Sequence, residues 1–165
     1  MLIREAHTLD VPLLGHCLGG QLISKALGGV VRRNPIREIG WGEVMVIESA
    51  TAQTWFGDMK YFTAFHWHGE TFSLPIGAEH LLKSPYCENQ AWSIGKHLAL
   101  QTHIEMTTDM VEKWCEEGKD ELSDNNDNVA VQQANVMQKD LRSRCNSLSK
   151  VAEVVYTQWI AGLKH

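Results

Sequence analysis

A cysteine between two glycines is the feature of this sequence most able to do chemistry. Cys17 lies in a G-x-C-x-G pattern. The short apolar run at residues 11–14 predicts a buried strand, and residues 18–27 predict a helix that a pair of glycines ends. Cys17 would then occupy a sharp strand-to-helix turn, where the helix N-terminus favours a thiolate. A buried structural cysteine beside a turn is the alternative interpretation of the same pattern.

A thiolate nucleophile needs a base, and the base needs an orienting group. His103 and Glu105 follow another short apolar strand, residues 98–101. In extended backbone the residues at i and i+2 project to the same side, so the carboxylate would lie beside the imidazole. Both candidate sites would then follow the carboxyl ends of strands, where open α/β sheets place their chemistry. A surface ion pair is the simpler explanation of an isolated H-x-E.

Three motifs in this order resemble the class I, triad-type glutamine amidotransferases. They are G-x-C-x-G-x-Q at residues 15–21, the run F-H-W-H-G-E-T-F-S-L-P at residues 65–75, and H-x-E at residues 103–105. The W-H-G version is similar to the branch that resembles the amidotransferase domain of GMP synthase, and the resemblance covers roughly residues 10 to 110. It implies an α/β fold of the class I glutamine amidotransferase (flavodoxin-like) type, an open sheet with helices on both faces.

The resemblance also implies the chemistry. Cys17 would be the nucleophile that attacks the side-chain amide carbon of glutamine, His103 the base and acid, and Glu105 the group that orients His103. A γ-glutamyl thioester would form, ammonia would leave, and water would release glutamate. No cofactor and no metal is implied. The partners implied are glutamine and a synthetase that accepts the ammonia.

The same resemblance assigns five residues to substrate binding. Leu18 would supply an oxyanion N–H from its backbone, and Gln21 matches the glutamine that contacts the substrate in the family. The backbone around His68 and Gly69 and the carboxylate of Glu70 fall where the family holds the α-amino and α-carboxylate groups of glutamine. The alternative for Glu70 is an ordinary loop carboxylate, since the W-H-G-E segment is predicted to be a loop.

Four residues depart from the usual motifs without removing any atom of the proposed triad. His16 stands where the family usually has an apolar residue, Gly20 where histidine is common, and Ile104 where the family has proline. Trp67 replaces a residue that is often serine. Each departure changes the surroundings of the triad and leaves its three side chains in place.

The resemblance further implies βα units before the cysteine that this sequence does not contain. We therefore expect an N-terminally truncated sheet with an exposed apolar edge, or a second copy of the chain that completes it. The Gly-rich loop that supplies the other oxyanion N–H would also be absent. Since loss of one such donor costs about 10²–10³ in rate, we expect this chain alone to be weakly active or inactive.

Composition excludes several classes of protein. The net charge of −5, from 15 basic and 20 acidic residues, argues against a nucleic-acid surface. No apolar stretch is long enough to span a membrane, and no signal peptide is visible. The four cysteines form neither a C-x-x-C motif nor a disulfide framework, which predicts the cytoplasm.

The chain divides into an amidotransferase-like α/β domain at residues 1–118, incomplete at its N-terminus, and a C-terminal helical extension at residues 119–165 that packs on it. Residues 35–42 and 123–128 are predicted loops. Apolar residues at spacings of three and four from 134 to 159 predict one amphipathic helix, or two helices broken near residues 147–149. A partner-binding helix is the less favoured use of that face.

Three alternatives to an amidotransferase remain open. The first is a zinc site built from His66, His68, His103 and Glu105 with Cys17 nearby. The second is a γ-glutamyl or small-peptide hydrolase of the same fold, which would use the same Cys-His pair. The third is a catalytically impaired binding or regulatory protein.

Overall fold

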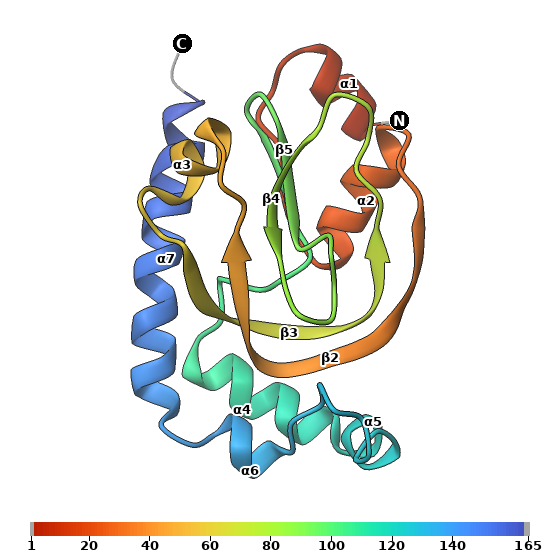
Figure 1. Ribbon diagram of the computed structural model, residues 1–165, viewed down its shortest axis with the longest axis vertical. Coiled ribbons are helices and arrows are strands. Elements are labelled where there is room, and N and C mark those ends of the chain that lie inside the picture. Colours follow the sequence, from red (N-terminus) through yellow and green to blue (C-terminus); the bar gives the residue numbers. More distant parts are fainter. Residues whose placement is uncertain (1, 164–165) are drawn as a thin grey trace.

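Six strands form one curled mixed sheet in the computed structural model, which describes residues 2–163 (Figure 1). The strand order is β1-β6-β5-β4-β2-β3, and β1 and β6 are parallel whereas every other neighbouring pair is antiparallel. The candidate site residues Cys17 and His103 follow the carboxyl ends of the two parallel strands. The strands are β1 (Leu14–His16), β2 (Val31–Val46), β3 (Tyr61–Phe72), β4 (Glu79–Lys83), β5 (Ala91–Ile94) and β6 (His97–Leu100).

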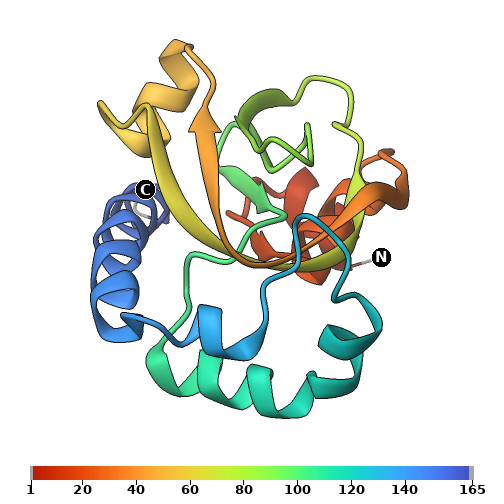
Figure 2. The same ribbon diagram turned by 60° about the horizontal axis from the view of Figure 1, so that its bottom comes forward.

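Helices cover both faces of the sheet. Helices α1 and α2 lie on one side, α7 runs along the opposite side, and α4 to α6 cross beneath the long strands (Figures 1 and 2). This arrangement confirms the predicted class I glutamine amidotransferase fold. The helices are α1 (Leu2–Thr8), α2 (Leu18–Ala26), α3 (Ala50–Phe56), α4 (Thr108–Glu117), α5 (Lys119–Asp124), α6 (Ala134–Met137) and α7 (Leu141–Ala161).

Strand β6 separates two apolar cores. Leu98 and Leu100 point into the larger core, which α3, α4 and α7 close, whereas Ala99 points into a smaller core with Ile23 of α2. All three β6 residues are fully buried. Burial of a leucine side chain stabilises a fold by about 1.5–3 kcal/mol, so β6 is a rigid support for the residues that follow it.

Strands β2 and β3 are longer than predicted. Residues 35–42 belong to β2 and the W-H-G-E segment belongs to β3, so both predicted loops were wrong. The register between the two strands shifts between Arg33 and Glu38, and this irregularity accommodates Pro35. His68 and Glu70 are consequently held on a paired strand.

The tail also differs from the predictions. Helix α5 includes Ser123 and Asp124, which were predicted to lie in a loop. Helix α7 continues through residues 147–149, and the chain breaks earlier, between α6 and α7, where Asp140 has a φ of 53°. Helix α1 precedes the strand that leads to Cys17, and Met1 lies outside the described residues.

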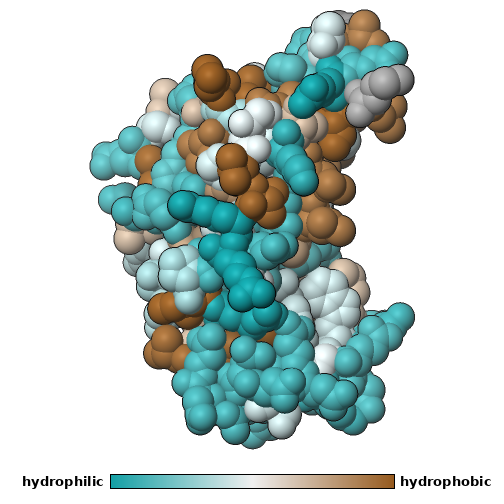
Figure 3. Space-filling view, turned by 90° about the vertical axis from the view of Figure 1, so that its right-hand side faces the viewer, coloured by the Kyte–Doolittle hydropathy of each residue, from teal (hydrophilic) through white to brown (hydrophobic). Residues whose placement is uncertain are grey.

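Strand β1 ends the sheet and pairs with β6 alone among the described strands. Apolar side chains gather on the face shown in Figure 3, in its upper part, while hydrophilic side chains cover its lower part. The exposed apolar residues of the chain include Val11, Leu18 and Leu22, around β1 and α2. None of the described helices is both long and apolar enough to cross a membrane.

Candidate active site

Cys17 lies on the predicted strand-to-helix turn. It directly follows β1, caps α2, and has the unusual dihedral angles φ 48° and ψ −110°. A non-glycine residue with positive φ typically costs about 1–3 kcal/mol, so the surrounding backbone must hold it there. The Cys17 N–H donates to the Leu100 carbonyl over 2.8 Å and ties the turn to β6. The local geometry is that of a nucleophile elbow.

Two glycines of the motif are required by close backbone contacts. A Cβ on Gly15 would lie 2.5 Å from the carbonyl carbon of Gly19, and a Cβ on Gly20 would lie 2.6 Å from the Leu100 oxygen. A Cβ on Gly19, in contrast, would meet nothing within 4 Å. The elbow therefore fits against β6 only because positions 15 and 20 lack side chains.

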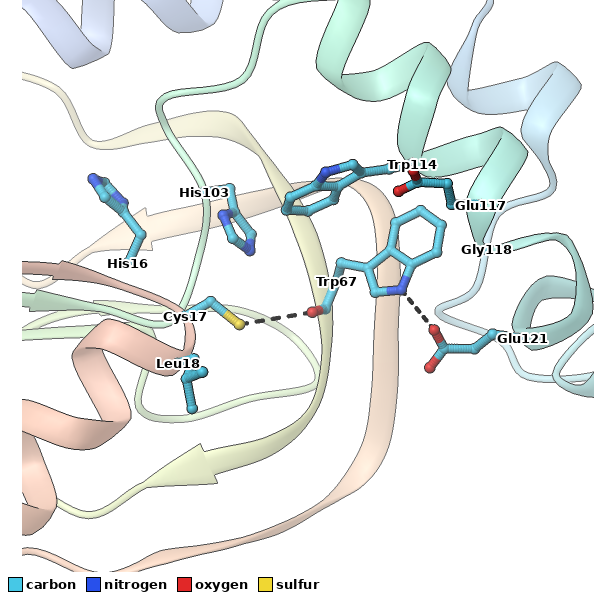
Figure 4. A pocket seen from close by; sticks show the side chains of 9 residues that line it. All are labelled: His16, Cys17, Leu18, Trp67, His103, Trp114, Glu117, Gly118 and Glu121. Atoms are coloured by element: carbon cyan, nitrogen blue, oxygen red, sulfur yellow. Dashed lines mark hydrogen bonds between the residues drawn. The ribbon is translucent and has the colours of Figure 1, made fainter.

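His103 and Glu105 lie together as predicted. His103 Nδ1 is 2.5 Å from Glu105 Oε1, and His103 is held by backbone hydrogen bonds in both directions with Phe65 of β3. The imidazole lies next to Cys17 in Figure 4. Trp114 of α4 packs its ring edge-to-face on His103, with centroids 4.9 Å apart. His103 is thus fixed by a carboxylate on one side and an indole on another.

The charges of this group follow from its contacts. Burial acts to lower the pKa of His103, but the interactions with Cys17 and Glu105 outweigh it and raise the pKa to about 9. Burial acts to raise the pKa of Glu105, and the contacts with His103 and His16 outweigh it and lower the pKa. At neutral pH the pair is an imidazolium beside a carboxylate. The stability linked to the raised pKa of His103 is complete below the ordinary histidine pKa of about 6.5 and is lost as the pH rises through about 9. The stability linked to the lowered pKa of Glu105 is lost as the pH falls through that pKa.

We predict that Glu105→Gln lowers the pKa of His103 by about one unit or more, because burial then acts without the compensating carboxylate. Histidine ring NMR as a function of pH measures this directly. His103 should titrate near 9 in the wild-type protein and clearly lower in the variant. Glu116→Gln, which removes an exposed carboxylate on α4 that pairs with Lys119, is the matched control. Identical titration midpoints in the wild-type protein and Glu105→Gln would contradict the assigned contact.

Cavities open on two sides of Cys17. The first has a volume of about 460 Å³ and is mostly apolar. In Figure 4 Trp67 and Trp114 form its wall, and the Trp67 indole N–H donates to Glu121 over 2.7 Å. The second cavity is more polar and extends along β2 and β3. The first cavity is lined by His16, Cys17, Leu18, Trp67, His103, Trp114, Glu117, Gly118 and Glu121.

The structure brings all five predicted substrate-binding residues to the second cavity: Leu18, Gln21, His68, Gly69 and Glu70. Leu18 is the first residue of α2, so its N–H is not used within the helix. Gln21 is buried and donates to the Glu70 carbonyl over 3.4 Å. Glu70 itself is exposed on β3, and its side chain is therefore free to meet a ligand.

Sequence reasoning missed three further residues of this region. Arg33 and Arg37 of β2 line the polar cavity. Arg37 was overlooked because residues 35–42 were predicted to be a loop. Gln101 directly follows β6, donates its Nε2 N–H to the Cys17 sulfur over 3.5 Å, and accepts at Oε1 from Gln21 over 3.0 Å. The sequence signal that could have found Gln101 was an amide side chain at the end of an apolar strand.

Among the described residues, one buried cluster could hold a metal ion: Glu38, His66 and His68, whose ligand atoms lie within 4.8 Å of one another. This is not the zinc set considered from the sequence, since His103 and Glu105 belong to the Cys17 group. The Glu38 carboxylate already accepts hydrogen bonds from Ser84 and Gln90, and His68 Nε2 lies 3.1 Å from it. These contacts account for Glu38 and His68, whereas the two ring nitrogens of buried His66 make no hydrogen bond within the described residues.

The fold and the elbow define a class I glutamine amidotransferase. The family described as "Glutamine amidotransferase class-I" matches residues 1–113, and the chain belongs to it. A glutamine amidotransferase from Methylobacillus flagellatus has a similar crystal structure, with 42% identity and a TM-score of 0.94 over 98% of this chain and 67% of that one.

Curated relatives of this chain include proteins described as glutamine amidotransferase-like and as a GMP synthase subunit. A glutamine amidotransferase-like protein of Salmonella typhimurium, YfeJ, is 33% identical over 125 residues, which is 74% of this chain and 52% of that protein. One of the subunits of the glutamine-hydrolysing GMP synthase of Methanosarcina mazei is 37% identical over 89 residues, or 54% of this chain and 45% of that protein. The chain thus spans about half the length of these curated relatives.

Proposed function

We propose that the protein hydrolyses the side-chain amide of glutamine through Cys17. The observation that carries the proposal is the elbow cysteine next to an imidazole that a carboxylate orients. Cys17 Sγ attacks the amide carbon, and ammonia leaves with a proton from His103. The resulting γ-glutamyl thioester is attacked by water, which gives its proton to His103, and glutamate is released. The Leu18 N–H is the oxyanion donor at the elbow.

The polar cavity is the proposed site for the two charged groups of glutamine. Arg33 and Arg37 are suited to the α-carboxylate, and Glu70 to the α-ammonium group. Arg37 also pairs with Glu121, so its guanidinium is held over Gly69. This assignment directs the side chain of a bound glutamine along α2 toward Cys17.

Replacing Cys17 tests the function. Glutamine should yield glutamate and ammonia in equal amounts, and Cys17→Ala should reduce the rate by about 10³-fold or more, because no other group can form the thioester. Cys145→Ala, which removes a buried thiol of α7, is the control and should retain the activity. Glutamate release that persists in Cys17→Ala would contradict the proposal.

A second candidate function is hydrolysis of a γ-glutamyl amide or small peptide. The apolar cavity beside Cys17 favours it, because about 460 Å³ between two indoles has room for a leaving group larger than ammonia. A γ-glutamyl anilide distinguishes the two functions. A kcat/KM for the anilide well above that for glutamine would favour the hydrolase, and the reverse would favour the amidotransferase.

We also propose a partner that accepts the ammonia. The likeness to one subunit of a GMP synthase supports a synthetase on a separate chain. The exposed apolar residues near β1 could instead contact a second copy of the chain. Light scattering of the protein alone separates these two arrangements, since only the second gives a dimer without a synthetase.

A further inference from the structure

The Glu105 carboxylate has a second neighbour besides His103. His16 Nδ1 lies 3.2 Å from Glu105 Oε2, while Oε1 contacts His103. On its other side, His16 Nε2 is 3.0 Å from the Tyr156 hydroxyl, and the two rings meet edge-to-face. A continuous row of polar groups therefore runs from His103 through Glu105 and His16 to Tyr156 on α7.

The donors and acceptors of this row fix the position of each proton. A carboxylate oxygen only accepts, so the His16 nitrogen facing Glu105 carries the proton. In a neutral imidazole the opposite nitrogen, Nε2, then has the lone pair, and Tyr156 donates to it. Burial lowers the pKa of His16 against the opposing effect of Glu105, and burial raises the pKa of Tyr156 to about 12. Both shifts favour a neutral His16 and a protonated Tyr156.

These contacts involve His16, which stands where the resemblance to the family implies an apolar residue. An apolar side chain at residue 16 could not contact Glu105 through a proton. Glu105 Oε2 and His16 Nδ1 are both buried, and neither makes a hydrogen bond within the described residues, so their 3.2 Å approach is a polar contact without hydrogen-bond geometry. An unpaired buried charge is costly, and this contact reduces that cost. The His16 side chain is itself only 17% exposed. Its charged and titratable neighbours are Glu105, His103 and Tyr156, with Cys17 next to it in the chain.

We propose that His16 and Tyr156 are positioning residues of the Cys17 site. Tyr156 donates to Nε2 of His16 and holds its ring, and His16 anchors the second oxygen of Glu105, so that Glu105 holds His103 toward Cys17. The C-terminal helix α7 thereby takes part in the active site through a residue 140 positions from His16. The catalytic effect of this row rests on the proposed function, whereas its protonation pattern does not.

Kinetics test the catalytic effect. His16→Leu should lower kcat for glutamine about tenfold and leave KM unchanged, because the polar contact that holds the Glu105 carboxylate is lost while the polar cavity proposed for glutamine is not altered. His16→Asn should recover most of kcat, since its amide N–H can take the place of Nδ1–H. Tyr156→Phe is measured in the same assay. Its control is Tyr61→Phe, which alters an exposed tyrosine. A kcat for His16→Leu within about twofold of wild type would overturn the proposal.

Nitrogen-15 NMR of the histidine rings tests the arrangement without any turnover. His16 should be the neutral Nδ1–H tautomer at pH 7 in the wild-type protein. In Tyr156→Phe the Nε2 resonance of His16 should shift because this nitrogen loses its hydrogen-bond donor, while the Nδ1–H tautomer and the fold are retained. An Nε2–H tautomer or an imidazolium in the wild-type protein would overturn the proposal. Glutamate release tests the proposed function separately, and this spectrum decides the role of His16 with or without turnover.

Discussion

His103→Asn is expected to lower kcat for glutamine by about 10²–10⁴-fold, because both proton transfers of the proposed reaction pass through this ring. The variant keeps a small polar side chain beside Glu105 at a position that is already buried, so the fold should tolerate it. Initial rates of glutamate release at saturating glutamine are the measurement. The effect should appear in kcat, since the ring does not line the polar cavity.

The control for this variant is His80→Asn. His80 lies on β4, and its ring bonds only to backbone carbonyls of Leu82 and Glu88 among the contacts that the structure gives. It should leave kcat within about twofold of wild type, as for a residue away from the chemistry. A His103→Asn protein as active as His80→Asn would remove His103 from the mechanism.

Gly20→Ala is expected to destabilise the protein by about 1–3 kcal/mol, because the new Cβ would lie 2.6 Å from the Leu100 carbonyl oxygen. That oxygen also accepts the Cys17 N–H, so the elbow must move when the clash is relieved. We therefore expect glutamine hydrolysis to fall as well. Urea denaturation followed by tryptophan fluorescence measures the free energy of unfolding.

Gly19→Ala provides the matched comparison within the same helix. Its Cβ would meet no atom within 4 Å, and alanine reduces the entropy of the unfolded chain. The free energy of unfolding should therefore rise by about 0.4–1 kcal/mol. Equal destabilisation by the two substitutions would show that helix position, and not the contact with β6, accounts for the effect.

The positions of the candidate site residues were more predictable from the sequence than the strands that surround them. Cys17 is held by short-range constraints, a strand end and a helix start on either side of glycines, and these are visible in a local pattern. His103 and Glu105 lie two apart in extended backbone, so their contact also followed from spacing. The parallel pairing of β1 and β6 then brought the two motifs together.

The lengths of β2 and β3 could not be predicted because residues that usually break strands occur inside them. Pro35 lies at the irregular register of β2. Gly42 makes room for His66, since a Cβ there would lie 2.9 Å from the imidazole. Both features depend on the partner strand. The two serines at 147 and 149 suggested a break between two helices as one of two possibilities. Both serines are exposed and Leu148 between them is buried, so helix α7 continues through these positions without a break.

The contact of His16 with Tyr156 lay beyond any local pattern. The residues are separated by 140 positions, and only the packing of α7 on the sheet brings them together. From the sequence, His16 was visible merely as a departure from the family. A polar side chain at a position that is usually apolar indicated that residue 16 has a polar contact. The sequence did not show that the contacting residue is Tyr156.

The most direct test of the account is alkylation of the protein by a chloroketone analogue of glutamine, located by peptide mass spectrometry. We predict that Cys17 alone of the four cysteines is modified, that glutamine slows the modification, and that His103→Asn slows it as well. This result does not require turnover or a partner. Modification of Cys17 at the same rate with and without glutamine, or equal modification of Cys87, Cys115 or Cys145, would contradict a glutamine site at this thiol.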